Sequence, residues 1–335
     1  MSQRSIGSGL TTMHSSAPLV SVIIPCFNQA HFLSESVESA LSQTHCETEI
    51  IVVDDGSPDN VFEVVSRYPT VKCVQQQNQG VVAARNAGFR VSTGDYVLFL
   101  DADDRLMPHA IESHLGCFAK HPEAGFVVGD IDQIAADGSY IYSPRWPIVE
   151  ASHYEELLRV NHVANTIAVM FRRSVIDELG GFEALYSPAE DYELLLRATR
   201  LFSSVHHRTV VAQYRRHPAN LSRQGTVMLR ALHRVMERQL PIVDGNPTLK
   251  RAWREGTRYW RDRFGPTTIK QLYAHLRHCE IRGAISAAAT LVRYVRGRLF
   301  VFPWIYRHEG LNYLRCRFLR RPNHERHRVS TVRGH

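Results

Sequence analysis

The amino-acid sequence predicts an α/β protein: a mostly parallel β-sheet with helices on both faces, followed by a helical, strongly basic C-terminal region. Three observations lead to this prediction. Short β-branched runs alternate with helical segments through the first hundred residues. Acidic clusters follow directly after several of those runs. Arginine accumulates in the last third of the chain, where only helical patterns remain.

Four strands and three helices alternate in the first hundred residues. The first strand is a continuous β-branched run, which is typical of a strand buried on both faces. The alternation favours a parallel sheet, because crossover connections return successive strands in the same direction. We predict strands over residues 19–25, 49–53, 71–74 and 96–100, and helices over residues 30–43, 59–68 and 80–91.

Beyond residue 108 the pattern becomes mixed, and beyond about residue 226 it indicates helices alone. We predict helices over residues 108–120 and 189–201, strands over residues 125–132, 168–171 and 205–214, and a turn at residues 136–138. As domains we expect a flexible N-terminus over residues 1–17, a catalytic domain over residues 18–224 and a helical basic region over residues 225–335.

The composition is that of an ordinary globular protein, with 44% hydrophobic and 22% charged residues among 335. The first eighteen residues contain no apolar run typical of a secretory signal, and no stretch reaches the roughly 18 apolar residues of a spanning helix. The six cysteines form no CxxC pair, which favours reduced thiols. We therefore expect a cytoplasmic protein that can associate peripherally with the inner face of a membrane.

The charge is divided unevenly. Residues 226–335 carry 23 Lys and Arg against 7 Asp and Glu, a balance of +16, whereas the other residues carry 17 against 26, a balance of −9. Together these give the net charge of +7. An acidic α/β portion with a basic C-terminal region indicates two surfaces with different partners.

Three carboxylates lie within four residues at the end of the fourth predicted strand: Asp101, Asp103 and Asp104. Mg²⁺ and Mn²⁺ prefer oxygen ligands, and usually bind through one or two protein carboxylates and the phosphates of a substrate. The cluster therefore favours a divalent ion that bridges a diphosphate. Taken alone, it is also compatible with an ordinary acidic turn.

Polar residues also follow the first two strands. Pro25 and Asn28 end the first strand, and Asp54 and Asp55 end the second. Ligands of parallel sheets bind outside the carboxyl ends of the strands, where these clusters converge. A carboxylate there can accept a hydrogen bond from a base or a ribose, although Asp-Asp-Gly-Ser is also common turn chemistry.

A further group of candidates lies beside two predicted helices. Gly80 begins a helix that carries Arg85, and both a helix N-terminus and an arginine suit a phosphate. Glu190 and Asp191 begin another helix, either as a general base or because acids are favoured in a first turn. His217 follows the last strand and is either a metal ligand or a structural histidine.

In this order the clusters resemble the family 2 glycosyltransferases of the GT-A fold, a Rossmann-like architecture. The resemblance rests on residues 20–44, 49–59, 78–104, 180–182 and 190–191, and it covers about residues 18–224. It implies an inverting, metal-dependent hexosyltransferase that moves a sugar from a nucleotide-diphosphate sugar, with a UDP-sugar as the expected donor. As acceptor it implies a hydroxyl of a glycan, a lipid-linked oligosaccharide or a protein, and as process the synthesis of a surface polysaccharide, a lipopolysaccharide or another glycoconjugate.

The resemblance also implies roles for individual residues. Asp191, with Glu190 beside it, matches the catalytic base. Asp101 and Asp103 match the DxD motif that binds ribose and Mg²⁺ or Mn²⁺, Asp104 can substitute for one of them, and His217 matches a histidine that reaches the metal. The nucleotide is expected to contact Pro25, Asn28, Asp54, Asp55, Gly80, Arg85, Asp101 and Ala102.

Near the C-terminus, six apolar residues recur at helical spacing and give one apolar stripe. Such a helix can lie on an anionic membrane surface with its arginines at the edge, or it can pack its stripe on the catalytic domain. The stripe consists of Ile281, Ile285, Ala288, Val292, Val295 and Leu299.

The sequence features also bear on three other classes of function. A nucleotidyltransferase is disfavoured because Cys26 to Gln29 is not a glycine-rich phosphate loop. A catalytically silent sugar-nucleotide-binding or scaffold protein is the main alternative, and loss of the DxD motif or the base would favour it. Nucleic acid is not expected as a partner, since no recognised binding motif accompanies the basic charge.

Overall fold

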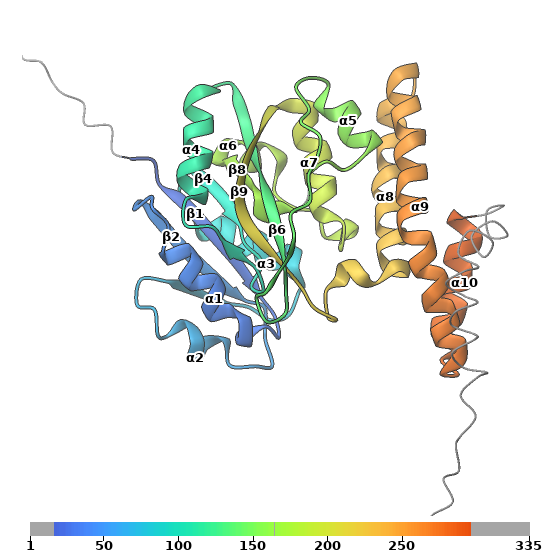
Figure 1. The fold of residues 1–335 in the computed structure, drawn as a ribbon, viewed down its shortest axis with the longest axis horizontal. Helices are drawn as coiled ribbons and strands as arrows, with labels where there is room; N and C mark the ends of the chain where they lie inside the picture. The colour runs from blue at the N-terminus through green and yellow to red at the C-terminus, as the bar shows by residue number, and fades with distance from the viewer. Residues whose placement is uncertain (1–16, 164, 296–335) are drawn as a thin grey trace, which may run out of the picture.

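A computed structural model describes residues 17–163 and 165–295 of the chain (Figure 1). At its centre is a nine-stranded sheet in the order β3-β2-β1-β4-β8-β6-β9-β5, with β7 paired to β6. The strands are β1 Val20–Cys26, β2 Thr48–Asp54, β3 Lys72–Gln75, β4 Tyr96–Phe99, β5 Arg105–Leu106, β6 Ala124–Ala135, β7 Tyr140–Tyr142, β8 Val169–Arg172 and β9 Ser203–Arg216.

The sheet is mostly parallel, as predicted. β1 pairs in parallel with β2 and β4, β2 with β3, and β6 with β9. The strands β5, β7 and β8 run in the opposite direction to their neighbours. Because β1, β2 and β4 are parallel neighbours, their carboxyl ends lie at one edge of the sheet.

Helices cover both faces of the sheet, because alternate side chains of each strand point to opposite faces. In β1, Val22 and Ile24 belong to one core cluster with α1, α2 and α4, whereas Ile23 belongs to another with α3, α6 and α7. The helices in the first 201 residues are α1 Ala30–Leu41, α2 Val61–Val65, α3 Val81–Val91, α4 Ala110–Lys120, α5 His153–Arg159, α6 Arg173–Leu179 and α7 Glu190–Leu201.

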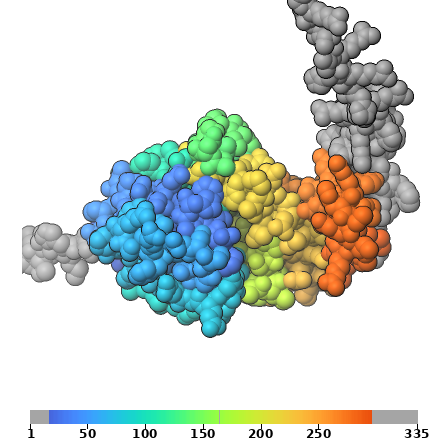
Figure 2. Space-filling model, turned by 90° about the horizontal axis from the view of Figure 1, so that it is seen from below, coloured from blue at the N-terminus to red at the C-terminus, as the bar shows by residue number. Residues whose placement is uncertain are grey.

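The last described segment is helical: α8 Gly225–Val243, α9 Pro247–Arg277 and α10 Ile281–Tyr294. One apolar cluster runs without a break from the sheet through α7 into these helices, and it includes Phe99, Leu195, Leu232, Trp260 and Leu291. Figures 1 and 2 show α10 at one end of the molecule, with α8 and α9 between it and the sheet. The domain division at residue 224 stays a prediction.

The predicted strands are present with small changes in length, and the turn at residues 136–138 joins β6 to β7. Sequence analysis missed β5, β7, α5 and α6, and the predicted helix over residues 59–68 is shorter as α2. These are two- to seven-residue elements, so their hydrophobic pattern is too brief to show a period. Three very short helical turns complete the fold: η1 Thr166–Ala168, η2 Ala184–Tyr186 and η3 Leu221–Arg223.

Several expectations fall beyond the described ranges: the flexible N-terminus up to residue 16, the basic region from residue 296, and Leu299 of the apolar stripe. Within residues 17–163 and 165–295, none of the helices combines the length and the apolar character needed to cross a bilayer.

Candidate functional site

The three predicted acidic or polar clusters lie at the carboxyl ends of β1, β2 and β4. Asp101 follows β4 after Leu100, and Asp54 ends β2 opposite Cys26 of β1. The backbone N–H of Asp55 donates to the carbonyl of Cys26 over 3.0 Å, which ties the ends of β1 and β2 together. Segments from different parts of the first hundred residues therefore meet at one edge of the sheet.

Asp55 organises the loop that leads into α3. Its carboxylate accepts hydrogen bonds from the Gln76 side chain at 2.7 Å and from the backbone N–H groups of Gln79 at 2.9 Å and Gly80 at 2.8 Å. Gly80 has a φ of +86°, a conformation that glycine adopts without strain. Asp55 is 2% exposed, so the chain itself already occupies most of its acceptor capacity.

The neighbouring predicted residues shape the same loops. Asp54 accepts from the backbone N–H of Ser57 over 2.9 Å. The Ser57 hydroxyl in turn accepts from the backbone N–H of Asn28 over 3.1 Å, and Asn28 has a φ of +55°. Pro25 is buried within β1. Asp54 and Asn28 thus hold two adjoining turns at the sheet edge, and Pro25 lies beneath them.

Arg85 is a buried cation between two of the predicted site carboxylates. Its Nη2 lies 2.6 Å from Asp101 Oδ1, and its Nη1 lies 2.7 Å from Glu190 Oε1. Burial by itself lowers the pKa of Arg85, but the charges of Asp101 and Glu190 raise it above its ordinary value. Arg85 therefore stays charged and joins the β4 turn to the start of α7.

Asp103 and His217 meet directly. Nε2 of His217 lies 2.7 Å from Oδ2 of Asp103, and Nδ2 of Asn220 lies 3.3 Å from the same oxygen. Burial and the charge of Asp101 raise the pKa of Asp103, and the contact with His217 opposes that shift. His217 begins the loop after β9, so the contact connects the β4 turn to the far end of the last strand.

Asp104 faces the protein interior. It is 1% exposed, and its Oδ1 accepts from the backbone N–H of Arg215 over 2.7 Å. Burial, followed by the charges of Asp103 and Asp101, raises the pKa of Asp104 well above its ordinary value. These contacts make Asp104 a residue that holds the turn against β9.

Sequence analysis missed Arg215, which is 1% exposed and contacts the turn of Asp101 to Asp104 through its side chain. Its Nε donates to the Asp103 carbonyl at 2.7 Å, its Nη1 to the Ala136 carbonyl at 2.9 Å, and its Nη2 to Glu35 at 2.6 Å. The guanidinium also stacks over Phe32, 4.8 Å from the ring centre. No local signal distinguishes Arg215 from Arg216 beside it.

Asp191 is half-buried in the first turn of α7, where its Oδ1 accepts from the backbone N–H of Tyr192 over 2.7 Å. Burial, and next the charge of Glu190, raise its pKa from 3.8 to about 7. A carboxylate with this pKa is suited to accept and release a proton near neutral pH. Glu190 itself is 5% exposed and committed to Arg85.

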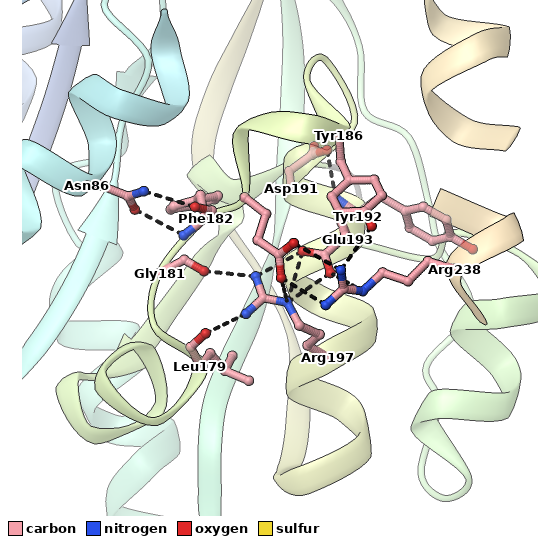
Figure 3. A network of polar contacts seen from close by, with 11 residues as sticks. Asn86, Leu179, Gly181, Phe182, Tyr186, Asp191, Tyr192, Glu193, Arg197 and Arg238 are labelled. Carbon is pink, nitrogen blue, oxygen red and sulfur yellow. Dashed lines mark hydrogen bonds and ion pairs between the residues drawn. The ribbon is translucent and has the colours of Figure 1, made fainter. Parts of the chain in front are cut away.

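A polar network below this turn fixes the position of α7 (Figure 3). Glu193 is fully buried and pairs with Arg197, whose guanidinium also donates to the carbonyls of Leu179 and Gly181. The side chain of Asn86 on α3 donates to the Phe182 carbonyl at 2.9 Å and accepts from the Phe182 N–H at 3.0 Å. Of these residues, the resemblance included Gly181 and Phe182, whereas Glu193 and Arg197 carried no signal in the sequence.

The side chains of Asp101, Asp103 and His217 fit a divalent ion that takes its remaining ligands from phosphate. Asp101 and Asp103 keep side-chain exposures of 26% and 12%, and the imidazole of His217 lies against Asp103. Among residues 17–163 and 165–295, no three His, Cys, Asp or Glu side chains form a metal-ligating group by themselves. Ions such as Mg²⁺ bind through one or two protein carboxylates plus substrate phosphates, so such a closed group is not required.

Residues 21–180 match the family model described as glycosyl transferase family 2. The chain is 31% identical to a chondroitin synthase of Escherichia coli over 189 residues, 55% of this chain and 27% of that protein. It is 32% identical to a hyaluronan synthase of Pasteurella multocida over 192 residues, 55% of this chain and 19% of that protein. The match thus spans less than a third of either relative.

Solved structures share the fold. The mannosyltransferase PcManGT from Pyrobaculum calidifontis, in complex with GDP-Man and Mn²⁺, gives a TM-score of 0.55 at 18% identity, over 90% of this chain and 81% of that chain. S. aureus TarS 1-349 in complex with UDP-GlcNAc gives 0.51 at 15% identity, over 79% and 89%. These likenesses confirm the predicted GT-A type of fold.

Proposed function

We propose that this protein transfers a sugar from a nucleotide-diphosphate sugar to a hydroxyl group with inversion at the anomeric carbon, because residues 21–180 match the family model described as glycosyl transferase family 2. One observation carries the proposal. One buried cation, Arg85, pairs with Asp101 of the acidic turn at 2.6 Å and with Glu190, the chain neighbour of Asp191 in the first turn of α7, at 2.7 Å. A base and a diphosphate site are the two parts that this reaction needs.

In the proposed reaction, Asp191 accepts the proton of the acceptor hydroxyl as its oxygen attacks the anomeric carbon. The bond from that carbon to the phosphate oxygen breaks, and the nucleoside diphosphate leaves with the electron pair. Attack from the opposite face inverts the configuration in a single displacement. Glu190 is committed to Arg85, so its proposed part is to raise the pKa of Asp191 by its charge.

The leaving diphosphate carries the negative charge that develops in the reaction. A Mg²⁺ or Mn²⁺ ion held by Asp101, Asp103 and His217 would neutralise that charge as a Lewis acid. The pairing of Asp101 with Arg85 keeps a second positive charge next to the turn. Asp104 is proposed to position the turn and not to bind the ion, because its carboxylate is buried against Arg215.

For the donor we propose a UDP-sugar, bound at the sheet edge that is formed by the end of β1 at Pro25, the turns of Asn28 and Asp54, the loop of Asp55 and Gly80, and Ala102. The solved neighbours carry UDP-GlcNAc in one case and GDP-Man in the other, so a likeness of fold is compatible with either nucleotide. For the acceptor we propose a glycan hydroxyl in polysaccharide synthesis, supported by relatives named chondroitin synthase and hyaluronan synthase.

The test is a panel of UDP-, GDP- and dTDP-sugars, with binding and hydrolysis measured with and without Mn²⁺ for wild type and Asp103→Ala. We expect one donor to bind in a metal-dependent manner and the variant to lose that binding. If the folded wild-type protein bound no donor in the presence of metal, the transferase proposal would fail. Binding without hydrolysis or transfer to any glycan would favour the sugar-nucleotide-binding scaffold.

A further inference from the structure

Helix α10 packs on the protein through one face only. Ala284, Ala287 and Leu291 on that face are 0–7% exposed. Arg230 of α8 donates from Nε to the Thr290 hydroxyl over 2.6 Å and from Nη2 to the Ser286 carbonyl over 2.6 Å. α10 is therefore held firmly, with a defined buried face and a defined outer face.

The outer face carries large aliphatic side chains. Ile281, Ile285 and Val292, which we call the outer stripe, are 71%, 64% and 63% exposed. Spacings of four and seven residues place them on one side of the helix, about one above the other. The predicted apolar stripe thus does not pack on the catalytic part of the chain at these three positions. The packed face uses Ala284, Ala287 and Leu291, together with Val295 of the predicted stripe, which is 2% exposed.

Positive charge borders the outer stripe. Arg282 and Arg293 each follow a stripe residue, are exposed, and lie eleven residues apart on one side of α10. Arg293 also lies 3.7 Å from Glu237 of α8, a pair in which both side chains stay more than half exposed. From Gly225 to Tyr294, α8 to α10 and their connections contain 13 Lys and Arg against 5 Asp and Glu. An aliphatic row beside an arginine row on a basic helical unit is the pattern of a helix that lies in a membrane interface.

We infer that the outer stripe binds the surface of an anionic lipid bilayer, with Ile281, Ile285 and Val292 in the acyl boundary and Arg282 and Arg293 at the headgroups. Charge complementarity selects this occupant over another protein surface. Three aliphatic side chains also cover far less than the roughly 800 Å² per partner of a stable protein interface. The inference does not depend on the proposed transfer reaction.

The experiment is co-sedimentation of the full chain with vesicles of phosphatidylcholine alone and of phosphatidylcholine with phosphatidylglycerol. We expect binding to the anionic vesicles and little to the neutral ones. Ile285→Glu is expected to weaken vesicle binding about tenfold or more, because it removes one aliphatic side chain from the acyl boundary and adds a negative charge. Arg282→Gln is expected to weaken it about fivefold.

A matched control is Phe62→Glu, which adds the same charge at an apolar residue that is 63% exposed on α2, far from α10. It is expected to bind vesicles like wild type. Thermal unfolding of each variant checks that the fold is intact, and donor binding is measured separately, so failure of the transferase proposal is recognised independently.

Three results would overturn the inference. The first two are absence of anionic-vesicle binding by the wild type and equal binding by wild type and Ile285→Glu. The third comes from analytical sedimentation of both proteins without lipid, which measures their oligomeric state. If Ile285→Glu converted a dimer to a monomer, the outer stripe would be a contact between subunits and not a lipid surface.

Discussion

Nη1 of Arg85 lies 2.7 Å from Oε1 of Glu190, and both side chains are buried. The two residues are 105 positions apart, so this ion pair fixes α3 against the start of α7. It also sets the charge around Asp191, since Glu190 raises and Arg85 lowers the pKa of that carboxyl. The geometry of the candidate site and its protonation chemistry therefore depend on the same contact.

Arg85→Gln is expected to lower the free energy of unfolding by about 3–5 kcal/mol, because it leaves a buried carboxylate without its cation. Urea unfolding measures this loss. Arg90→Gln is the control, since Arg90 lies on the same helix but is exposed. A change below about 1 kcal/mol for Arg85→Gln, the range of exposed ion pairs, would show that the buried pair contributes little.

Asp191→Asn is expected to lower kcat by roughly 10²–10⁴-fold while donor affinity is retained, because only the proton acceptor is lost. Asp177→Asn, an exposed change on α6, is the control. Steady-state kinetics and donor titration separate the two effects. Loss of donor affinity with an unchanged kcat would instead assign Asp191 to binding.

The activity of the wild type is expected to rise with pH and to level off above about pH 7, because the base acts in its deprotonated form and its pKa is raised from 3.8 to about 7. The rise should amount to about tenfold per pH unit below the pKa. The dependence of kcat/KM on pH from 5 to 9 measures it. A flat profile would exclude Asp191 as the titrating base.

Stability has the opposite dependence on pH. The folded-state pKa of Asp191 is raised, so its contribution to stability is fully present below its ordinary pKa of 3.8 and is lost as pH rises through about 7. The free energy of unfolding of Asp191→Asn minus that of wild type should therefore increase from pH 4 to pH 8. If the free energies of unfolding of the two proteins changed with pH in parallel, the raised pKa would be contradicted.

Asp103→Ala and Asp104→Ala are expected to differ. Asp104→Ala leaves the buried N–H of Arg215 without its acceptor and should lower stability by about 1–3 kcal/mol. Asp103→Ala should mainly abolish the Mn²⁺ dependence of donor binding. Thermal unfolding and donor titration on both variants test this division. A stable Asp104→Ala protein without metal dependence would make Asp104 a ligand after all.

Arg215→Ala is expected to be strongly destabilising, by about 3 kcal/mol or more, because Glu35 and two carbonyl groups lose a buried cation. Arg216→Ala, next to it and exposed, serves as the control. Chemical unfolding measures both. Similar stabilities for the two variants would mean that the contacts of Arg215 do not hold the turn.

The sequence by itself determined the sheet, its parallel direction and the edge where the site residues meet. Long β-branched runs and regular helical patterns carry that information locally, and the acidic clusters mark the strand ends. It did not reveal β5, β7, α5 or α6, whose few residues give no periodic signal. The predicted strand ends did bring Asp54 and Asp101 to one edge.

Only the tertiary structure decided which carboxylate faces which partner. Asp101, Asp103 and Asp104 are nearly equivalent in sequence, yet they meet Arg85, His217 and the Arg215 backbone respectively. Those partners come from α3 and from β9 and the loop after it, between 16 and 114 positions away. The same holds for α10: its period predicted an apolar stripe, but packing against α8 and α9 selected the alanine face and left Ile281, Ile285 and Val292 exposed. Burial and charge pairing are properties of the assembled chain, and no local pattern contains them.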